Sequence, residues 1–154
     1  MATFQSLQMS TPKYPVSGPG IGGRSLKVER AEVSLASLNG GAALAIGDVI
    51  QLFKLHPKFR IVSGHVQIKA ALGAGVTGII GDAGDDDRYF VSQSYNTAGT
   101  TTTIAETGRD FLSAATAPGG AGRYTTVNLT IQGAVPNTTG SVVVILTGYI
   151  EEPA

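Results

Sequence analysis

Four aspartates form the densest cluster of potential metal ligands in the sequence: Asp82, Asp85, Asp86 and Asp87, spaced by one alanine and one glycine. Carboxylates on a flexible loop suit Ca²⁺, which takes about six to eight oxygen ligands. The spacing is not that of an EF-hand loop, and no glutamate follows at its last ligand position. We therefore favour a solvated turn, whose aspartates cap a short helix at Arg88 or bind their own backbone, with calcium as the alternative.

No other group of reactive side chains converges on a catalytic site. The two histidines, His56 and His65, do not have the spacing of a metal pair. The chain has no cysteine, which excludes disulfides, thiolate metal sites and thiol catalysis. The glycine-rich stretch at 17–23 lacks the Gly-Lys-Ser/Thr of a phosphate loop, and no Gly-x-Ser-x-Gly nucleophile elbow occurs. We therefore expect no enzymatic activity, no cofactor and no metal.

The composition is that of a neutral, folded domain. Among 154 residues, 11 are basic and 11 acidic, so the formal net charge is zero, and 14% of residues are charged, against about 25% in an average protein. A neutral chain lacks the attraction that nucleic-acid binding requires. No apolar run approaches the ~18 residues of a membrane span. We expect neither nucleic acid nor membrane as a partner, and low net charge makes the chain a candidate for an assembly.

From residue 25 onward the sequence has the pattern of short β-strands. The clearest alternation runs from Lys58 to Ala71, where Val62, Gly64, Val66, Ile68 and Ala70 share the predicted buried face and Ser63, His65, Gln67 and Lys69 share the polar face. The other predicted strands are 25–37, 49–53, 76–81, 100–105, 123–132 and 141–150, while 88–95 fits a strand or a short helix and 109–116 could hold a helical turn. About eight short strands without intervening helices predict an all-β fold, an antiparallel β-sandwich of jelly-roll type.

Residues 1–25 differ in composition from the rest, with three prolines and four glycines between positions 11 and 23. Such a stretch is either a disordered tail or an extended arm that orders against a neighbouring subunit. The candidate anchors of such a partner-binding arm are Phe4, Tyr14, Pro15 and Ile21. The sequence therefore predicts an extended N-terminal arm at 1–25 and a β-sandwich domain at 26–154.

The stretch from Gly47 to Tyr95 contains, in order, the segments GDVIQLFKL at 47–55, RIVSG at 60–64, ALGAGVT at 71–77 and GDAGDDDRY at 81–89. This order resembles the decoration or cement proteins on the heads of tailed bacteriophages. The resemblance implies a jelly-roll or sandwich subunit that forms a dimer or trimer and binds the outside of the capsid against internal DNA pressure. It also implies turn positions at Gly47, Gly64, Gly73 and Gly81, core positions at Phe53 and Val62, and no catalytic or cofactor residues.

The expected function is that of a structural virion protein that cements the lattice of the major capsid protein. A homo-oligomer is expected, with a trimer favoured over a dimer. The expected location is the capsid exterior, after synthesis in the host bacterial cytoplasm, because the N-terminus lacks the order of a signal peptide. Deleting residues 1–22 is expected to leave the body folded and to weaken capsid attachment.

Two other functions remain open for the same fold. A carbohydrate-binding or lectin-like module usually needs an aromatic platform, whereas this chain has no tryptophan and 6% aromatic residues. A phage tail or baseplate structural protein would share the composition and the habit of assembly.

Overall fold

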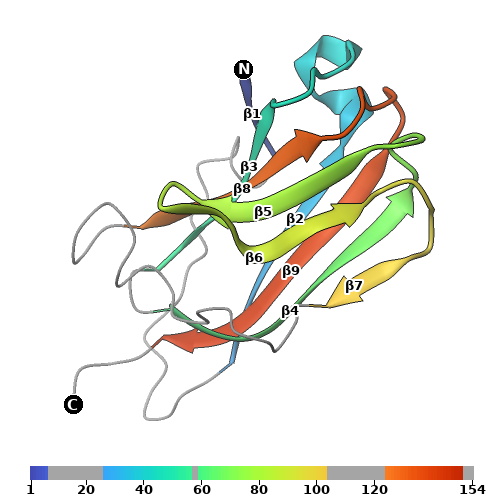
Figure 1. Ribbon diagram of the computed structural model, residues 1–154. Helices are drawn as coiled ribbons and strands as arrows, with labels where there is room; N and C mark the ends of the chain where they lie inside the picture. The colour runs from blue at the N-terminus through green and yellow to red at the C-terminus, as the bar shows by residue number, and fades with distance from the viewer. Residues whose placement is uncertain (7–25, 57–58, 104–123, 151–154) are drawn as a thin grey trace.

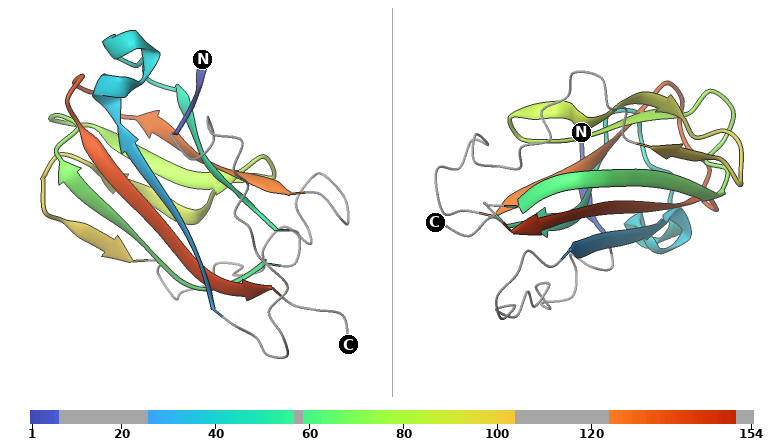
Figure 2. Two further views of the ribbon diagram at one scale, coloured as in Figure 1. Left: turned by 180° about the vertical axis from the view of Figure 1, so that it is seen from behind. Right: turned by 90° about the horizontal axis from the view of Figure 1, so that it is seen from below.

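The computed structural model describes residues 1–6, 26–56, 59–103 and 124–150. Their strands form two sheets that pack face to face as a sandwich (Figure 1, Figure 2). The five-stranded sheet has the order β1 (Thr3–Gln5), β3 (Val49–Leu55), β8 (Thr125–Gln132), β5 (Thr77–Asp82) and β6 (Asp85–Ser94). The four-stranded sheet has the order β2 (Lys27–Ser34), β9 (Ser141–Ile150), β4 (Phe59–Ala70) and β7 (Thr101–Thr103). Two 3₁₀ turns, Leu35–Ser37 and Asn39–Gly41, follow β2.

The strand order is that of a jelly roll. Strands β2, β9, β4 and β7 form one sheet and β3, β8, β5 and β6 form the other, so most neighbours in space are distant in sequence. Every pairing among these eight strands is antiparallel. The predicted antiparallel sandwich of jelly-roll type is confirmed. A ninth strand, β1, which the sequence pattern did not reveal, runs parallel to β3 at the edge of the five-stranded sheet.

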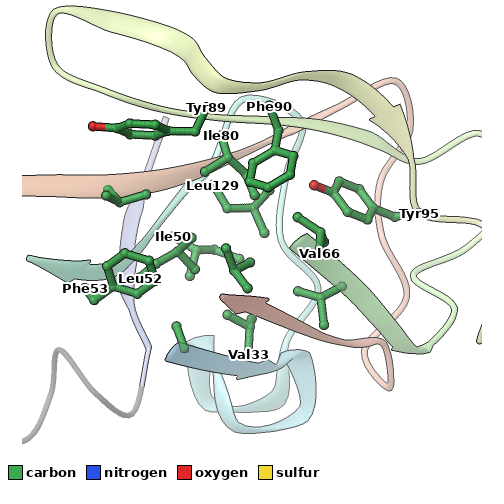
Figure 3. Close-up of a cluster of buried hydrophobic side chains, with 14 of the residues drawn as sticks. Val33, Ile50, Leu52, Phe53, Val66, Ile80, Tyr89, Phe90, Tyr95 and Leu129 are labelled. Atoms are coloured by element: carbon green, nitrogen blue, oxygen red, sulfur yellow. The ribbon is translucent and has the colours of Figure 1, made fainter. Parts of the chain in front are cut away.

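The hydrophobic core lies between the two sheets (Figure 3). Ile50 and Leu129 reach it from the five-stranded sheet, and Val33 and Val66 reach it from the four-stranded sheet, each with at most 1% of its surface exposed. Phe53 is 3% exposed, which confirms its predicted place in the core. Removing apolar surface from water stabilises the fold by about 25 cal/mol per Å², so these alternating positions hold the sheets together.

A β-bulge in β4 overturns one core prediction. The register with β9 shifts between Ile61 and Ser63, so Val62 is the extra residue in β4. Ile61 is buried at 5% exposure, whereas Val62 is 57% exposed. The bulge changes the phase of the alternation, because one inserted residue turns each later side chain to the opposite face. Gly64, Val66 and Ile68 then occupy the buried phase as predicted.

Two of the four predicted turn glycines are confirmed. Gly47 has φ of 88° and Gly73 has φ of 128°, and both belong to connections between strands. Only glycine adopts this backbone region readily. Gly64 and Gly81 are instead strand residues, in β4 and β5, so that prediction is wrong for them. Gly81 is required for another reason, because a Cβ there would collide with the backbone of Asp85 and Asp86.

Strand β9 is central, between β2 and β4, and one residue of its outer face is buried as well. Val142, Val144 and Leu146 point into the core, and Val143, on the opposite face, is also only 2% exposed. In the register of the sheet, Val143 lies between Glu32 of β2 and Gln67 of β4. The prediction that 141–150 is central or covered on both sides is confirmed.

Candidate functional site

The β5–β6 hairpin contains the aspartate cluster, and one member of it is buried. Asp82 ends β5 and has a side chain with 0% exposure. Its Oδ1 accepts the backbone N–H groups of Gly84 at 2.9 Å and Asp85 at 3.2 Å, which closes the turn. Its Oδ2 accepts the Tyr89 hydroxyl at 3.0 Å and lies 2.9 Å from Arg88 Nε. All of these partners come from the hairpin itself, so Asp82 joins the turn to the strand that follows it.

The remaining aspartates are on the surface. The carboxylates of Asp85, Asp86 and Asp87 lie within 4.8 Å of one another at the start of β6. Asp85 and Asp86 are exposed, and Asp87 is partly exposed. Asp82 faces inward and its two oxygens are already used, so the structure does not bring the four predicted candidates together around one point.

The local structure after the aspartates differs from one prediction. No helix begins at Arg88, because this residue lies inside the strand β6. The alternative of aspartates bound to their own backbone is the one observed, with Asp82 accepting Gly84 N–H and Asp85 accepting Asp87 N–H at 3.4 Å. Burial, followed by the neighbouring Asp82 carboxylate, raises the pKa of Tyr89, so its hydroxyl stays protonated and continues to donate.

The two histidines are far apart in the architecture. His56 follows β3 and contacts Tyr124 edge to face, with ring centroids 5.6 Å apart. His65 lies in β4, in the other sheet, opposite Ile145 of β9 and Thr103 of β7. Both are partly exposed. The structure therefore does not bring the two histidines together.

The first six residues belong to the sandwich. The Ala2 N–H donates to Asp48 Oδ1 at 2.7 Å, and the Ala45 N–H donates to Asp48 Oδ2 at 2.9 Å. These two backbone hydrogen bonds hold the pKa of the buried Asp48 carboxyl below its usual range. Ser6, which is 1% exposed, donates its hydroxyl to Leu52 O at 2.5 Å. Asp48 therefore fixes the N-terminal strand against the body.

One predicted arm residue can be placed. Phe4 lies in β1, opposite Ile50 of β3, and packs against the core of its own chain. Tyr14, Pro15 and Ile21 lie outside the described residues. A role of these residues in partner binding stays a prediction.

Three exposed apolar residues lie on the outer face of the four-stranded sheet, around one end of β9. Leu26 and Val28 are 64% and 60% exposed, and Val62 is 57% exposed. Val28 lies opposite Thr147 of β9, which lies opposite Ser63 of β4, next to the bulge at Val62. The three apolar side chains thus flank one end of β9 from both sides. The alternation of the sequence places Val28 on the face opposite to Ala31 and Val33. No sequence pattern indicates the bulge that exposes Val62.

Glu29 is a half-buried carboxylate in the four-stranded sheet. It lies in β2 on the same face as Ala31 and Val33, which are core residues. Burial raises the pKa of Glu29 to about 7, and the nearby Lys27 ammonium only partly opposes the shift. The carboxyl is therefore more easily protonated in the folded chain than in the unfolded one.

Glu29 should make the stability of the fold decrease as the pH rises. Its pKa is raised from 4.5 to about 7 on folding, so its favourable contribution is complete below about pH 4.5 and is lost as the pH rises through 7. Because the group is only half-buried, we expect a penalty of about 1–2 kcal/mol above pH 7. Glu29→Gln should remove this penalty at pH 8 and change little at pH 4, as measured by urea unfolding.

Glu32→Gln is the matched control for that measurement. Glu32 lies in the same strand on the outer face, and hydrogen bonds from Lys69 and Arg30 lower its pKa. Neutralising it should therefore give no gain in stability at pH 8. Equal unfolding free energies for Glu29→Gln and the wild type at pH 8 would contradict the buried-carboxylate interpretation.

In the described part of the chain, no helix is long and apolar enough to cross a membrane. Three features of the described residues remain as candidates for function. They are the β5–β6 hairpin with its aspartates, the contacts of Asp48 with the N-terminal strand, and the exposed apolar residues around one end of β9.

Comparison of sequences finds no matching protein family and no matching curated protein. Comparison of structures does find similar chains. One is from the capsid asymmetric unit of cyanophage Pam1, with a TM-score of 0.63 and 19% identity over 92% of this chain and 96% of that chain. Another is from the capsid of Ralstonia phage GP4, with a TM-score of 0.63 and 17% identity over 99% of this chain and 100% of that chain. Over nearly its whole length, this chain therefore has the fold of chains found in two phage capsid structures.

Proposed function

We propose that this protein is a structural component of a phage virion, which binds the outer surface of the capsid and stabilises the lattice of the major capsid protein. The observation that carries the proposal is the likeness to the two capsid chains, which extends over 96% and 100% of those chains. The likeness thus extends over nearly the whole length of each matched capsid chain. The earlier resemblance of residues 47–95 to cement proteins supports the same assignment.

The composition also supports a place in a large assembly. The chain has no net charge and few charged residues, and permanent assemblies use extensive, rather apolar interfaces. A capsid presents many identical sites, so modest contacts for each copy add up to stable coverage. We further propose synthesis in the host bacterial cytoplasm, where the chain would meet capsids as they assemble.

We propose that the protein acts without catalysis. The two carboxylates that are buried in the described part of the chain, Asp48 and Asp82, accept hydrogen bonds that hold the N-terminal strand and the β5–β6 hairpin. A carboxylate with such saturated structural contacts is poorly placed to exchange protons with a substrate. Both groups are explained by folding alone.

The direct test is binding to capsids assembled from the major capsid protein of the same genome. Purified protein should co-sediment with these capsids to a fixed number of copies per capsid, and should raise the temperature at which they disassemble. Binding to a glycan array without affinity for capsids would instead favour the carbohydrate-binding alternative. Binding to tails and not to capsids would favour the tail or baseplate alternative.

Deleting residues 7–22 should weaken capsid binding by at least about tenfold, because we propose that Tyr14, Pro15 and Ile21 contact the capsid. The deletion begins after Ser6, since removing residues 1–22 would also remove β1 and its contacts with Asp48 and Leu52. Co-sedimentation measures the binding, and circular dichroism checks that the body stays folded. The exposed-site variant Asp86→Ala is the control and should bind like the wild type. Unchanged capsid occupancy after the deletion would contradict the role of the arm.

A further inference from the structure

The sandwich has four edge strands among the described residues, and they differ in how well they are protected. β1 and β7 have three residues each. β6 begins with three aspartates, and its pairing with β5 is interrupted by two register shifts. Short strands, charges and bulges are the usual devices that prevent sheet edges from pairing with other chains. β2 has eight residues in unbroken register with β9 and contains neither proline nor glycine. Its four charged residues are two basic and two acidic, so they can also pair with opposite charges on another chain.

The open side of β2 presents main-chain groups in a regular row. The N–H of Leu35, the residue after β2, donates to the carbonyl oxygen of Gly140, the residue before β9, at 2.9 Å. In an antiparallel ladder alternate residues bond to the same neighbour, so the odd-numbered residues of β2 bond to β9. The main-chain groups of Val28 and Arg30 are therefore directed away from β9, where no described strand pairs with them.

The charges on the outer face of β2 are complementary to those of β2 in a second copy of the chain. Arg30 and Glu32 share the outer face of β2 and form an ion pair of 2.8 Å, with side chains 47% and 36% exposed. If two β2 strands pair antiparallel about a two-fold axis at Ala31, Arg30 of each copy lies opposite Glu32 of the other. The same register places Val28 opposite Ser34. The guanidinium has five donors, so Arg30 can bind Glu32 of both copies at once.

Other registers of the two β2 strands bring like charges opposite each other. A shift that centres the axis on Arg30 places two arginines face to face, and one that centres it on Glu32 does the same with two glutamates. Centring on Glu29 opposes two half-buried carboxylates. Like charges directly opposite each other destabilise a strand pair. The register at Ala31 avoids all of these and aligns most of β2, with about eight main-chain hydrogen bonds between copies.

We propose that two copies of this protein associate through antiparallel pairing of their β2 strands about a two-fold axis at Ala31, which joins the two four-stranded sheets into one. This adds an oligomeric state to the proposed function, on which it rests, and it gives a dimer where a trimer was favoured from the sequence. The ion pairs between Arg30 and Glu32 select the register, while the backbone hydrogen bonds hold the strands together.

The test uses single charge reversals and their mixture. The full chain should have the mass of a dimer in size-exclusion chromatography with light scattering. Arg30→Glu alone and Glu32→Arg alone should each weaken the dimer by about 30-fold or more, because each places like charges opposite each other twice. Mixed together, the two variants should form a heterodimer, since the side chain at position 30 of one is then opposite in charge to position 32 of the other.

Mixing distinguishes the interface from damage within the chain. Each reversal also disrupts the Arg30–Glu32 pair inside its own chain, and mixing cannot repair that. Val28→Pro gives a second check, because it removes an N–H directed away from β9 and blocks edge pairing while sparing the ladder with β9. A monomeric or trimeric wild type, an unchanged mass of the single variants, or no recovery on mixing would overturn the proposal. Co-sedimentation of the variants with capsids is measured separately, so loss of the dimer and loss of capsid binding are distinguishable.

Discussion

Asp82→Ala should lower the free energy of unfolding by about 3–5 kcal/mol. The substitution leaves the Arg88 side chain, which is 12% exposed, without the carboxylate 2.9 Å away. It also removes the acceptor for the Tyr89 hydroxyl and for two N–H groups of the turn. A buried charge that loses its partner costs far more than an exposed one, so this single residue decides whether the β5–β6 hairpin is stable.

Urea unfolding monitored by circular dichroism measures this effect, and Asp86→Ala is the matched control. Asp86 is exposed in the same hairpin, so its substitution should change stability by less than about 0.5 kcal/mol. Asp82→Asn should fall between the two, because an amide oxygen can still accept from the turn but does not balance Arg88. The melting temperature of Asp82→Ala should fall by about 6–20 °C. A decrease of less than about 1 kcal/mol in the free energy of unfolding would show that the contacts of Asp82 contribute little to stability.

Gly148→Ala should destabilise the fold by more than about 3 kcal/mol and prevent the recovery of folded protein in many preparations. Gly148 lies in β9 between Lys27 of β2 and Ile61 of β4. A Cβ at this position would overlap the carbonyl oxygen of Arg60 and lie 2.7 Å from Cε1 of Phe59, which is 1% exposed. The backbone of β4 cannot yield without breaking its pairing with β9, so the strain falls on the centre of the sheet.

Gly40→Ala separates this overlap from the ordinary cost of replacing glycine. Gly40 has φ of 63°, and a Cβ there meets nothing within 4 Å. Its substitution should therefore cost only about 1 kcal/mol, from the left-handed backbone alone. Soluble yield and denaturant midpoints compare the two variants. Equal midpoints would mean that β4 moves aside easily.

The sequence indicated the fold well because its strands are short and are separated by clear turn signals. Alternation in 58–71 placed Gly64, Val66 and Ile68 on the buried face correctly, since a sheet with one covered face imposes a period of two. The error at Val62 arose because a bulge depends on the partner strand, which a single sequence does not show. β1 was missed because Thr3–Gln5 is short and polar at both ends, and its place depends on the distant Asp48.

The aspartate cluster shows what limited the prediction of the site. Four similar carboxylates are adjacent in the sequence, but only Asp82 faces the interior, where Arg88 and Tyr89 meet it across the hairpin. The order Asp82-Ala83-Gly84-Asp85 is a turn signal that could have indicated a hairpin in place of a helix cap. Which aspartate is buried follows from register, and register is set by the partner strand.

The central position of β9 determines when this chain can fold during its synthesis. β9 is the last of the described strands to be synthesised, yet both β2 and β4 pair with it. Until residues 141–150 emerge, the four-stranded sheet has no middle strand. β2, made more than a hundred residues earlier, then pairs with no other described strand, and β4 pairs with β7 alone. Nascent chains thus expose unpaired strand edges, which can aggregate, until β9 has been made. Chains that terminate before β9 should be insoluble, because β2 and β4 then lack the strand that pairs with both of them.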